Sequence, residues 1–452
     1  MLIRSRRGFL RDAIRSVSAA GALGAMGKFG EMNALAINAN LPYQALVCIF
    51  LAGGNDGHNT VIPITTAQQN YNLYQQGRGA LALPQASLVP IHNGGDTYGL
   101  HPKLVEIGNL YNQAVSPVAV VANVGMLVKQ IDRNLYNSNN SAILPNALFS
   151  HSDQSSQWQT SIPTGLGDTG WGGRIADQLA PMNASATFPS MASTSGASLF
   201  VTGQQSFAAT VPAGSAQLLQ MNSQARLQGL QQLLTFDNGL KLVQASNGTL
   251  TRGVSYASTL NSALNGVTLT TTFPANNPLA VQLQTVARII KVRSSLGLSR
   301  QIFFCQLGGF DTHGSQLATQ DQLLQQLSQA TAAFYQATVD LNVQNMVTTF
   351  TASEFGRTLS PNGNGGSDHA WGSHHFVIGG GVQGGKFYGN YPDLHPGGPD
   401  DANSRGTLIP TTSVDQYAAT MAQWFGVQPG ANLATIFPNL GNFATKDLGI
   451  LG

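Results

Sequence analysis

Continuous apolar runs recur along the chain, and each run ends at glycine or at a polar cluster. Their β-branched and aromatic residues are typical of buried strands, because a strand covered on both faces needs no polar alternation. The predicted strands are 45–54, 118–125, 301–307, 345–355 and 374–381. Segments with helical spacing separate them. The predicted helices are 102–113, 170–179, 214–265, 278–296, 316–342 and 414–427, with another opening at DQSSQWQT.

This alternation predicts the fold class. Buried strands joined by helices favour an α/β three-layer sandwich with a largely parallel central sheet. Residues 185–300 differ, because they combine short strands such as ASLFVTG (197–203) with long Gln/Leu-rich helical patterns. We therefore expect residues 37–452 to form a single α/β domain with a cap-like helical insertion at 185–300.

The first 36 residues have a pattern of their own. Paired arginines in SRRGFLR (5–11) precede a small-residue apolar run (16–27), and ALA (34–36) is typical of a peptidase site. This order is that of a twin-arginine signal peptide over residues 1–36, and it disfavours a basic amphipathic first helix. The sequence therefore predicts export by the twin-arginine machinery, to the periplasm or as a secreted protein.

Removing the signal changes the charge. The whole chain has 22 basic and 20 acidic side chains, and those beyond residue 36 number 16 and 18, a net charge of −2. Such a balance offers no basic surface for nucleic acid or for an anionic membrane. No later segment is apolar over the ~20 residues that a membrane span needs. We expect neither nucleic-acid binding nor a membrane span after signal removal.

The scarcity of charge helps to locate a site. Charged residues make up 9% of the chain, against ~25% in ordinary domains, so the polar surface should consist of Asn, Gln, Ser and Thr. Clusters of ionisable groups therefore stand out. The two cysteines, Cys48 and Cys305, fall in predicted strands. In an exported protein they could pair, but buried free thiols are the favoured state.

Acidic residues follow three of the predicted strands. The pattern GG-x-D-x-H occurs at 53–58 and again at 308–313, and Glu354 closes a third strand. Since ligands of a parallel sheet gather beyond the carboxyl ends of its strands, Asp56, Asp311 and Glu354 should approach one another there. Carboxylates so close together need a cation or bound protons.

Histidines strengthen the case for a cation. Carboxylates mixed with neutral imidazoles are the donor set of divalent transition metals, and two ions ~3.5–4 Å apart would use all of them. Zinc suits His and Asp ligands, whereas manganese, magnesium or calcium prefers the oxygen-rich share. The predicted metal ligands are Asp56, Asp311, His313, Glu354, Asp368, His369, His374 and His375.

A candidate nucleophile precedes the helix that opens at DQSSQWQT. The hydroxyl of Ser150 or Ser152, which flank His151, would have helix amides and a metal nearby, and both favour attack. The alternative is a helix N-cap, which we expect for at least one serine. Arg174 and Arg357 are scarce cations beside the motifs and could clamp a phosphate or sulfate. Arg357 could instead pair with a nearby carboxylate.

Together these motifs resemble a known family. They are similar to those of an exported bacterial family, domain of unknown function 1501, which is distantly similar to the alkaline phosphatase and sulfatase superfamily. The resemblance rests on the twin-arginine start and on GGNDGHNTVIP, SHSDQ, GWGGR, GGFDTHGSQ, TASEFGRT and SDHAWGSHHFVIGGG. It implies an exported, metal-dependent hydrolase of small or polymeric phosphate or sulfate esters.

The superfamily resemblance also implies roles for individual residues. Asp56 resembles the first-strand metal ligand, Asp311 and His313 the later ligand pair, and Asp368–His369 the Asp-His dipeptide. The sequence around the two serines departs from the nucleophile motifs of sulfatases and phosphatases.

Two other functions remain open at this point. A secreted binding or assembly protein that keeps the fold without catalysis would suit the Asn/Gln/Ser/Thr-rich surface. A hydrolase of other esters could use Ser150 or Ser152 with His151, but adjacent residues on one element point apart, which disfavours this pair.

Overall fold

The core of the fold is one large β-sheet. The structure, a computed structural model, describes residues 42–214, 223–236 and 239–452, so the predicted signal peptide lies outside the described residues. The strands of the sheet are β1 (Gln44–Ala52), β5 (Val118–Gly125), β6 (Met191–Ser193), β7 (Ala209–Thr210), β8 (Arg300–Gly308), β9 (Val347–Ala352), β10 (Ser373–Ile378), β11 (Phe387–Tyr388) and β12 (Thr412–Ser413).

The order of these strands is β11-β5-β10-β9-β1-β8-β6-β7, and β12 pairs with β5. Neighbours are parallel except at β10, which is antiparallel to both β5 and β9. The predicted α/β class with a mostly parallel central sheet is confirmed.

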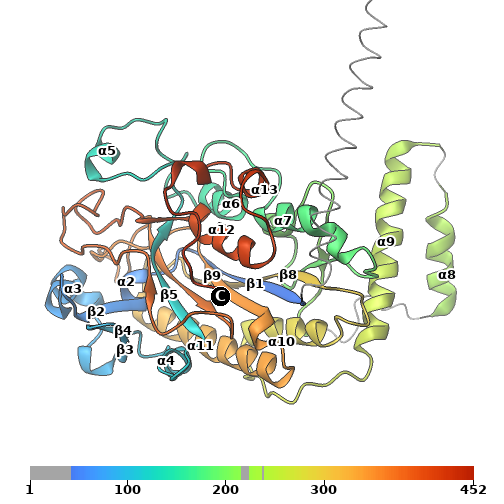
Figure 1. Cartoon of the computed structure of the whole chain (residues 1–452), viewed down its shortest axis with the longest axis horizontal. Helices are drawn as coiled ribbons and strands as arrows, with labels where there is room; N and C mark the ends of the chain where they lie inside the picture. Colours follow the sequence, from blue (N-terminus) through green and yellow to red (C-terminus); the bar gives the residue numbers. More distant parts are fainter. Residues whose placement is uncertain (1–41, 215–222, 237–238) are drawn as a thin grey trace, which may run out of the picture.

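Helices cover both faces of the sheet (Figure 1). On one face lie α4 (Val105–Tyr111), α10 (Pro278–Lys291) and α11 (Gln316–Asp340). On the other lie α6 (His151–Thr160), α7 (Trp171–Leu179), α12 (Val414–Trp424) and α13 (Ala431–Ile436). Along β1, alternate residues enter the two hydrophobic clusters, and both clusters are buried. This double burial explains why the strand reads as an unbroken apolar run.

The two cysteines illustrate this alternation. Cys48 on β1 packs into the cluster beneath α12, whereas Cys305 on the neighbouring β8 packs into the cluster beneath α10 and α11. Side chains on opposite faces of a sheet cannot meet. Both residues are buried free thiols, as the sequence favoured, and burial raises the pKa of each.

A small antiparallel sheet was not predicted. Its strands, β2 (Val61–Thr65), β3 (Val89–Asn93) and β4 (Asp96–Leu100), are arranged in the order β2-β4-β3. Two short helices, α2 (Gly57–Thr60) and α3 (Tyr71–Arg78), accompany it. Strands of five residues that include proline and polar positions give no apolar run, so the pattern could not reveal them.

The predicted insertion at 185–300 divides into two parts. Only α8 (Gln224–Leu233) and α9 (Lys241–Leu264) stand beside the body of the molecule (Figure 1). β6, β7 and α10 instead belong to the central sheet and its cover. The predicted strand at 197–203 is wrong: Leu199–Val201 forms a 3₁₀ turn, and the strand that pairs with β8 on this side is β6.

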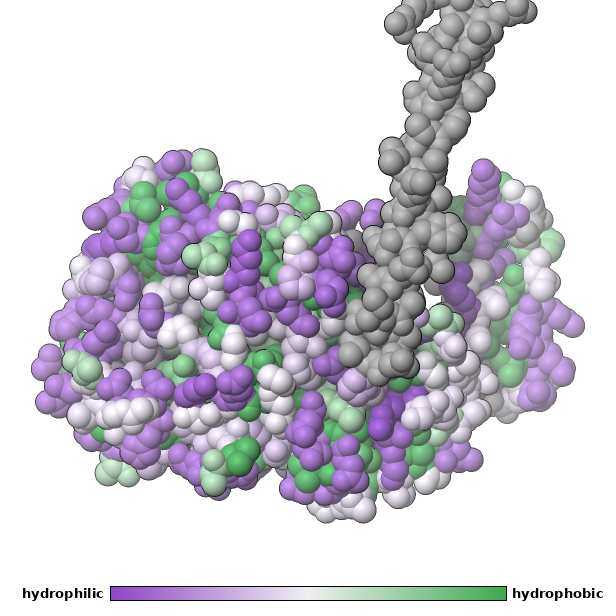
Figure 2. All heavy atoms as spheres, viewed as in Figure 1, coloured by the Kyte–Doolittle hydropathy of each residue, from purple (hydrophilic) through white to green (hydrophobic). Residues whose placement is uncertain are grey.

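The surface follows the composition. On the face shown in Figure 2, hydrophilic residues spread over the body with smaller hydrophobic areas between them. A short helix, α5 (Arg133–Asn137), lies in the polar segment after β5. None of the helices in the described ranges has the length and apolarity that a membrane span requires.

Candidate metal centre

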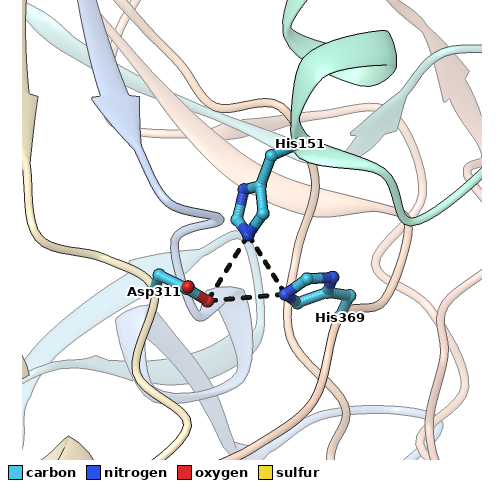
Figure 3. A group of neighbouring side chains, drawn as sticks. All are labelled: His151, Asp311 and His369. Carbon is cyan, nitrogen blue, oxygen red and sulfur yellow. Dashed lines mark hydrogen bonds and ion pairs between the residues drawn. The ribbon is translucent and has the colours of Figure 1, made fainter.

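Three side chains from distant parts of the chain converge beside the carboxyl ends of β8 and β9 (Figure 3). They are His151, the first residue of α6, Asp311, in the loop after β8, and His369, in the loop before β10. His151 Nε2 lies 3.1 Å from His369 Nε2 and 3.5 Å from Asp311 Oδ1. His369 Nε2 lies 3.4 Å from Asp311 Oδ1. In the described ranges this is the one group of three or more such residues that could share an ion.

A third imidazole adjoins this group. His313 Nε2 is 2.9 Å from His369 Nε2 and 3.1 Å from Asp311 Oδ1. Asp311 and His313 are nearly half exposed, with 49% and 45% of their side chains accessible. We call these four residues, His151, Asp311, His313 and His369, the rim cluster.

The hydrogen bonds of the other ring nitrogens define how each imidazole is protonated. His151 Nδ1 faces Glu354 Oε1 at 2.9 Å, and His369 Nδ1 faces the Phe149 carbonyl at 2.8 Å. Because a carboxylate and a carbonyl only accept, each Nδ1 is the donor. In a neutral ring, Nε2 then carries a lone pair.

His313 follows the same rule. Its Nε2 lies 3.4 Å from Arg357 Nη1, and since a guanidinium only donates, Nε2 is the acceptor. Its Nδ1 lies 3.5 Å from Asp368 Oδ1. The Nε2 atoms of His151 and His369 therefore face the Asp311 carboxylate oxygen as the ligands of a metal ion would, whereas His313 Nε2 faces the guanidinium of Arg357. Imidazoles oriented through Nδ1 by carboxylates and carbonyls are the usual arrangement at zinc.

Arg357 adjusts the charge of the rim cluster. Partial burial raises the pKa of Asp311, but the hydrogen bond and charge of Arg357 outweigh it, so this pKa lies below its ordinary value. Burial also lowers the pKa of His369. Both shifts favour the forms that bind a metal, a carboxylate and a neutral imidazole.

Backbone geometry brings these loops together. Gly53 follows β1 with φ of +121°, and a Cβ there would lie 2.3 Å from the Asp311 backbone nitrogen. Only glycine permits this approach of the two loops. Phe149, whose carbonyl holds His369, has φ of +72°, a costly conformation for a non-glycine residue.

Several predicted ligands lie elsewhere. Asp56 is buried, and its carboxylate contacts Arg78 and Gln316 instead of the rim cluster. His374 and His375 are buried in β10, where His374 stacks on Tyr391. Burial lowers the pKa of each of these two histidines to about 3. The structure brings none of these three predicted ligands to the ion-binding group.

Glu354 and Asp368 contact the rim cluster from outside. Glu354 is buried, and its Oε1 also accepts a hydrogen bond from the Gly53 backbone at 2.7 Å. Asp368 forms an ion pair with Arg405 at 2.7 Å. Each carboxylate therefore touches a histidine of the rim cluster through Nδ1, which suits an orienting role.

The predicted nucleophiles lie at the start of α6, and one of them is its cap. Ser150 is the N-cap of α6 and accepts from the Asp153 backbone, as expected for one of the serines. Ser152 Oγ lies 3.2 Å from both Ser150 Oγ and the Asp153 carboxylate. The hydrogen bonds of both hydroxyls stay within this first turn and do not reach His151.

The predicted anion-binding arginines are occupied by internal contacts. Arg174 donates to the carbonyls of Thr160, Thr169 and Ile436. Arg357 donates to the carbonyls of Gly53, Gly54 and Ser367 and to Asp311. The alternative interpretation of Arg357, pairing with a carboxylate, is confirmed.

His151 was expected to act in catalysis, but it lies among the candidate ligands. Its role as a candidate ligand could have been recognised from two features. The chain has only nine histidines, and this one lies at the start of a helix. The larger hollows, of ≈ 650 and ≈ 1050 Å³, lie along α8 and α9 and contain no acidic residue or histidine. Chemistry therefore points to the rim cluster and not to these hollows.

Comparisons place the chain among known proteins. The family model described as "Protein of unknown function (DUF1501)" matches residues 43–413. No curated protein matches the sequence.

Similar solved structures share little sequence. The lipoteichoic acid synthase LtaP from Listeria monocytogenes is 7% identical, with 82% of this chain and 74% of that one covered and a TM-score of 0.31. A putative sulfatase from Bacteroides thetaiotaomicron is 8% identical, with 88% and 75% covered and a TM-score of 0.34. The phosphonate monoester hydrolase of Agrobacterium radiobacter is 9% identical, with 85% and 74% covered and a TM-score of 0.32. Because the sequence identities and TM-scores are this low, the chemistry must be inferred from the geometry of the site itself.

Proposed function

The chain belongs to the DUF1501 family of proteins of unknown function, and we propose that it is an exported, metal-dependent hydrolase of phosphate or sulfate esters. The observation that carries the proposal is the convergence of the Nε2 atoms of His151 and His369 with the Asp311 carboxylate at a partly exposed rim, with His313 beside them.

The donor set favours zinc over harder cations. Two imidazole nitrogens and one carboxylate oxygen match ligands that zinc takes, whereas magnesium and calcium prefer an all-oxygen set. His151, Asp311 and His369 would hold the ion, with Glu354 and the Phe149 carbonyl orienting the two rings, and His313 with Asp368 would lie beside it. When bound, a divalent ion supplies Lewis acidity toward an ester oxygen or a water molecule.

The chain's own residues divide the remaining work. Arg357 keeps Asp311 ionised, and the exposure of Asp311 and His313 leaves the rim open to an ester. Because Ser150 caps α6 and Ser152 Oγ contacts Ser150 and Asp153 in the same turn, we propose that water, and not a serine, attacks the ester.

We further propose that the protein works in the periplasm or outside the cell. The support is the order of the twin-arginine pattern in residues 5–36. Replacing both Arg6 and Arg7 with Lys should leave the protein in the cytoplasm on cell fractionation. Unchanged export of this variant would remove the assignment.

The hydrolase proposal is tested on the purified protein. Elemental analysis should find zinc, and aryl phosphate or aryl sulfate should be hydrolysed by the wild type and not by Asp311→Ala. Chelation should remove activity and added zinc should restore it. Activity that survives Asp311→Ala would overturn the proposal.

A second function has its own support. Neither serine contacts the rim cluster, and both predicted anion-binding arginines are occupied. These contacts favour a secreted binding or assembly protein that holds a metal without turnover. Bound zinc, no hydrolysis of any aryl ester, and a stable complex in periplasmic pull-downs would select this function.

A further inference from the structure

We infer that Arg405 binds a second anionic group of the substrate, so that the preferred substrate is an ester with an additional negative charge. This inference rests on the proposed function, because it takes the rim cluster as the place where the ester group binds. A phosphate or sulfate ester is itself anionic, and the two arginines that could have held it, Arg174 and Arg357, donate to internal carbonyls.

The backbone at Arg405 is fixed. Its carbonyl accepts from the Ser360 backbone at 3.0 Å, and its amide donates to Asn403 Oδ1 at 3.1 Å. The next residue, Gly406, has φ of +74° and accepts from the Leu359 backbone and from His58 Nε2. A side chain on so well anchored a turn is presented in a defined place, which lowers the entropy lost on binding.

The side chain at this position is available. It is 44% exposed, and it forms an ion pair with Asp368 through Nη1. A guanidinium presents five N–H donors in a planar fork, so the edge formed by Nε and Nη2 can still bind an anion. Asp368 offsets part of the charge, so the expected gain in affinity is moderate.

Arg405 is also close to the rim cluster. Asp368 bridges it to His313, through Oδ2 at 2.7 Å on one side and Oδ1 at 3.5 Å on the other. One carboxylate and one imidazole therefore separate the guanidinium from the converging Nε2 atoms. A substrate lying across the exposed side chains of His313 and Asp311 would bring a second charged group to Arg405, while its ester group remains at the cluster.

The test uses two stable phosphonates on the zinc-loaded full chain. Phenylphosphonate carries one anionic group, and 4-carboxyphenylphosphonate carries a second at the far end of the ring. Titration calorimetry should show that the carboxylate strengthens binding about tenfold in the wild type, as one charge-assisted hydrogen bond would. In Arg405→Gln that gain should vanish, with phenylphosphonate binding and zinc affinity unchanged. The control is Arg252→Gln, on α9, which should behave as the wild type.

The variant Asp368→Asn distinguishes direct binding of the anion by Arg405 from an indirect effect of Arg405 on Asp368. If Arg405 binds the anion, freeing it from Asp368 should increase the gain from the carboxylate. If Arg405 only restrains Asp368, both variants should shift zinc affinity in the same direction and leave the gain unchanged. That result, or a wild type that does not distinguish the two phosphonates, would overturn the inference. The titration needs no turnover, so a protein that hydrolyses nothing can still support or exclude a role for Arg405.

Discussion

The two copies of GG-x-D-x-H, at 53–58 and 308–313, lie side by side and do different things. Their strands, β1 and β8, are parallel neighbours that pair Ala52 with Gly308. The first copy turns into α2 at its fifth residue, Gly57, so Asp56 caps that helix and is buried against Arg78. After the second copy the chain continues as a loop, and Asp311 is half exposed among histidines.

The difference shows what a motif can and cannot specify. Sequence spacing places an acid and an imidazole at the end of a strand, but the element that follows decides whether they face solvent. The first copy builds a buried ion pair, which makes removal of one partner costly. The second copy presents donors to an ion.

The largest expected effect separates the two acids by stability. Asp56→Ala should destabilise the protein by about 3–5 kcal/mol, because it leaves the buried Arg78 without its carboxylate. Asp311→Ala in metal-free protein should cost less than Asp56→Ala: Asp311 also pairs with a buried arginine, Arg357, but its own side chain is half exposed, so solvent screens the pair. Urea unfolding measures both, and equal costs would contradict the contrast.

For zinc affinity we expect the opposite ranking: changing Asp311 should have a large effect and changing Asp56 a small one. Asp311→Ala should weaken zinc binding by more than about 100-fold, because losing even an orienting residue costs 10–100-fold. Asp56→Asn, where it remains folded, should bind zinc as the wild type does. Competition with a chromogenic chelator gives both constants, and zinc affinity insensitive to Asp311 would exclude the rim cluster as the site.

The next effect is again on zinc affinity, and the two glutamates beyond residue 36, Glu354 and Glu106, serve as test and control. Glu354→Ala should weaken zinc binding by about 10–100-fold, because His151 loses the acceptor that orients its ring. Glu354→Gln retains an acceptor and should recover much of this affinity. Glu106→Ala, on α4, is the control and should leave zinc affinity unchanged; a similar loss there would indicate a general structural defect.

The smallest expected effect is on the pH dependence of stability, and it comes from His58 in the first copy of the motif. Burial lowers the pKa of His58 to about 4, below the ~6.5 of an unfolded chain. Above pH 6.5 both states are neutral, and as the pH falls toward 4 the unfolded chain takes up the proton first. The stabilising contribution of neutral His58 is therefore lost as the pH falls, by about 1 kcal/mol between pH 6.5 and 5.5.

His58→Gln removes this contribution. The difference in free energy of unfolding between wild type and variant should fall by about 1 kcal/mol from pH 7.5 to 5.5. Other buried groups, such as Asp415 with its pKa raised to about 7, act on both proteins and cancel. A difference that does not change with pH would show that His58 is not held neutral.

Much of the fold could be predicted from the sequence, because its central strands are buried on both faces and appear as apolar runs. The strand predicted at 118–125 matches β5 residue for residue. The small sheet could not be predicted, because its short strands contain prolines and polar residues. The candidate ligands were predicted in part: Asp311, His313 and His369 meet, whereas His374 and His375 follow the pleat of β10 into buried surroundings. No spacing rule could reveal that the Phe149 carbonyl holds His369.

The placement of Cys48 and Cys305 has a consequence for where this chain can mature. With one thiol on each side of the central sheet, no covalent crosslink within the chain can contribute to its stability. The fold should therefore be equally complete under reducing and oxidising conditions, and the redox potential of its surroundings sets no limit on the compartment in which it is assembled.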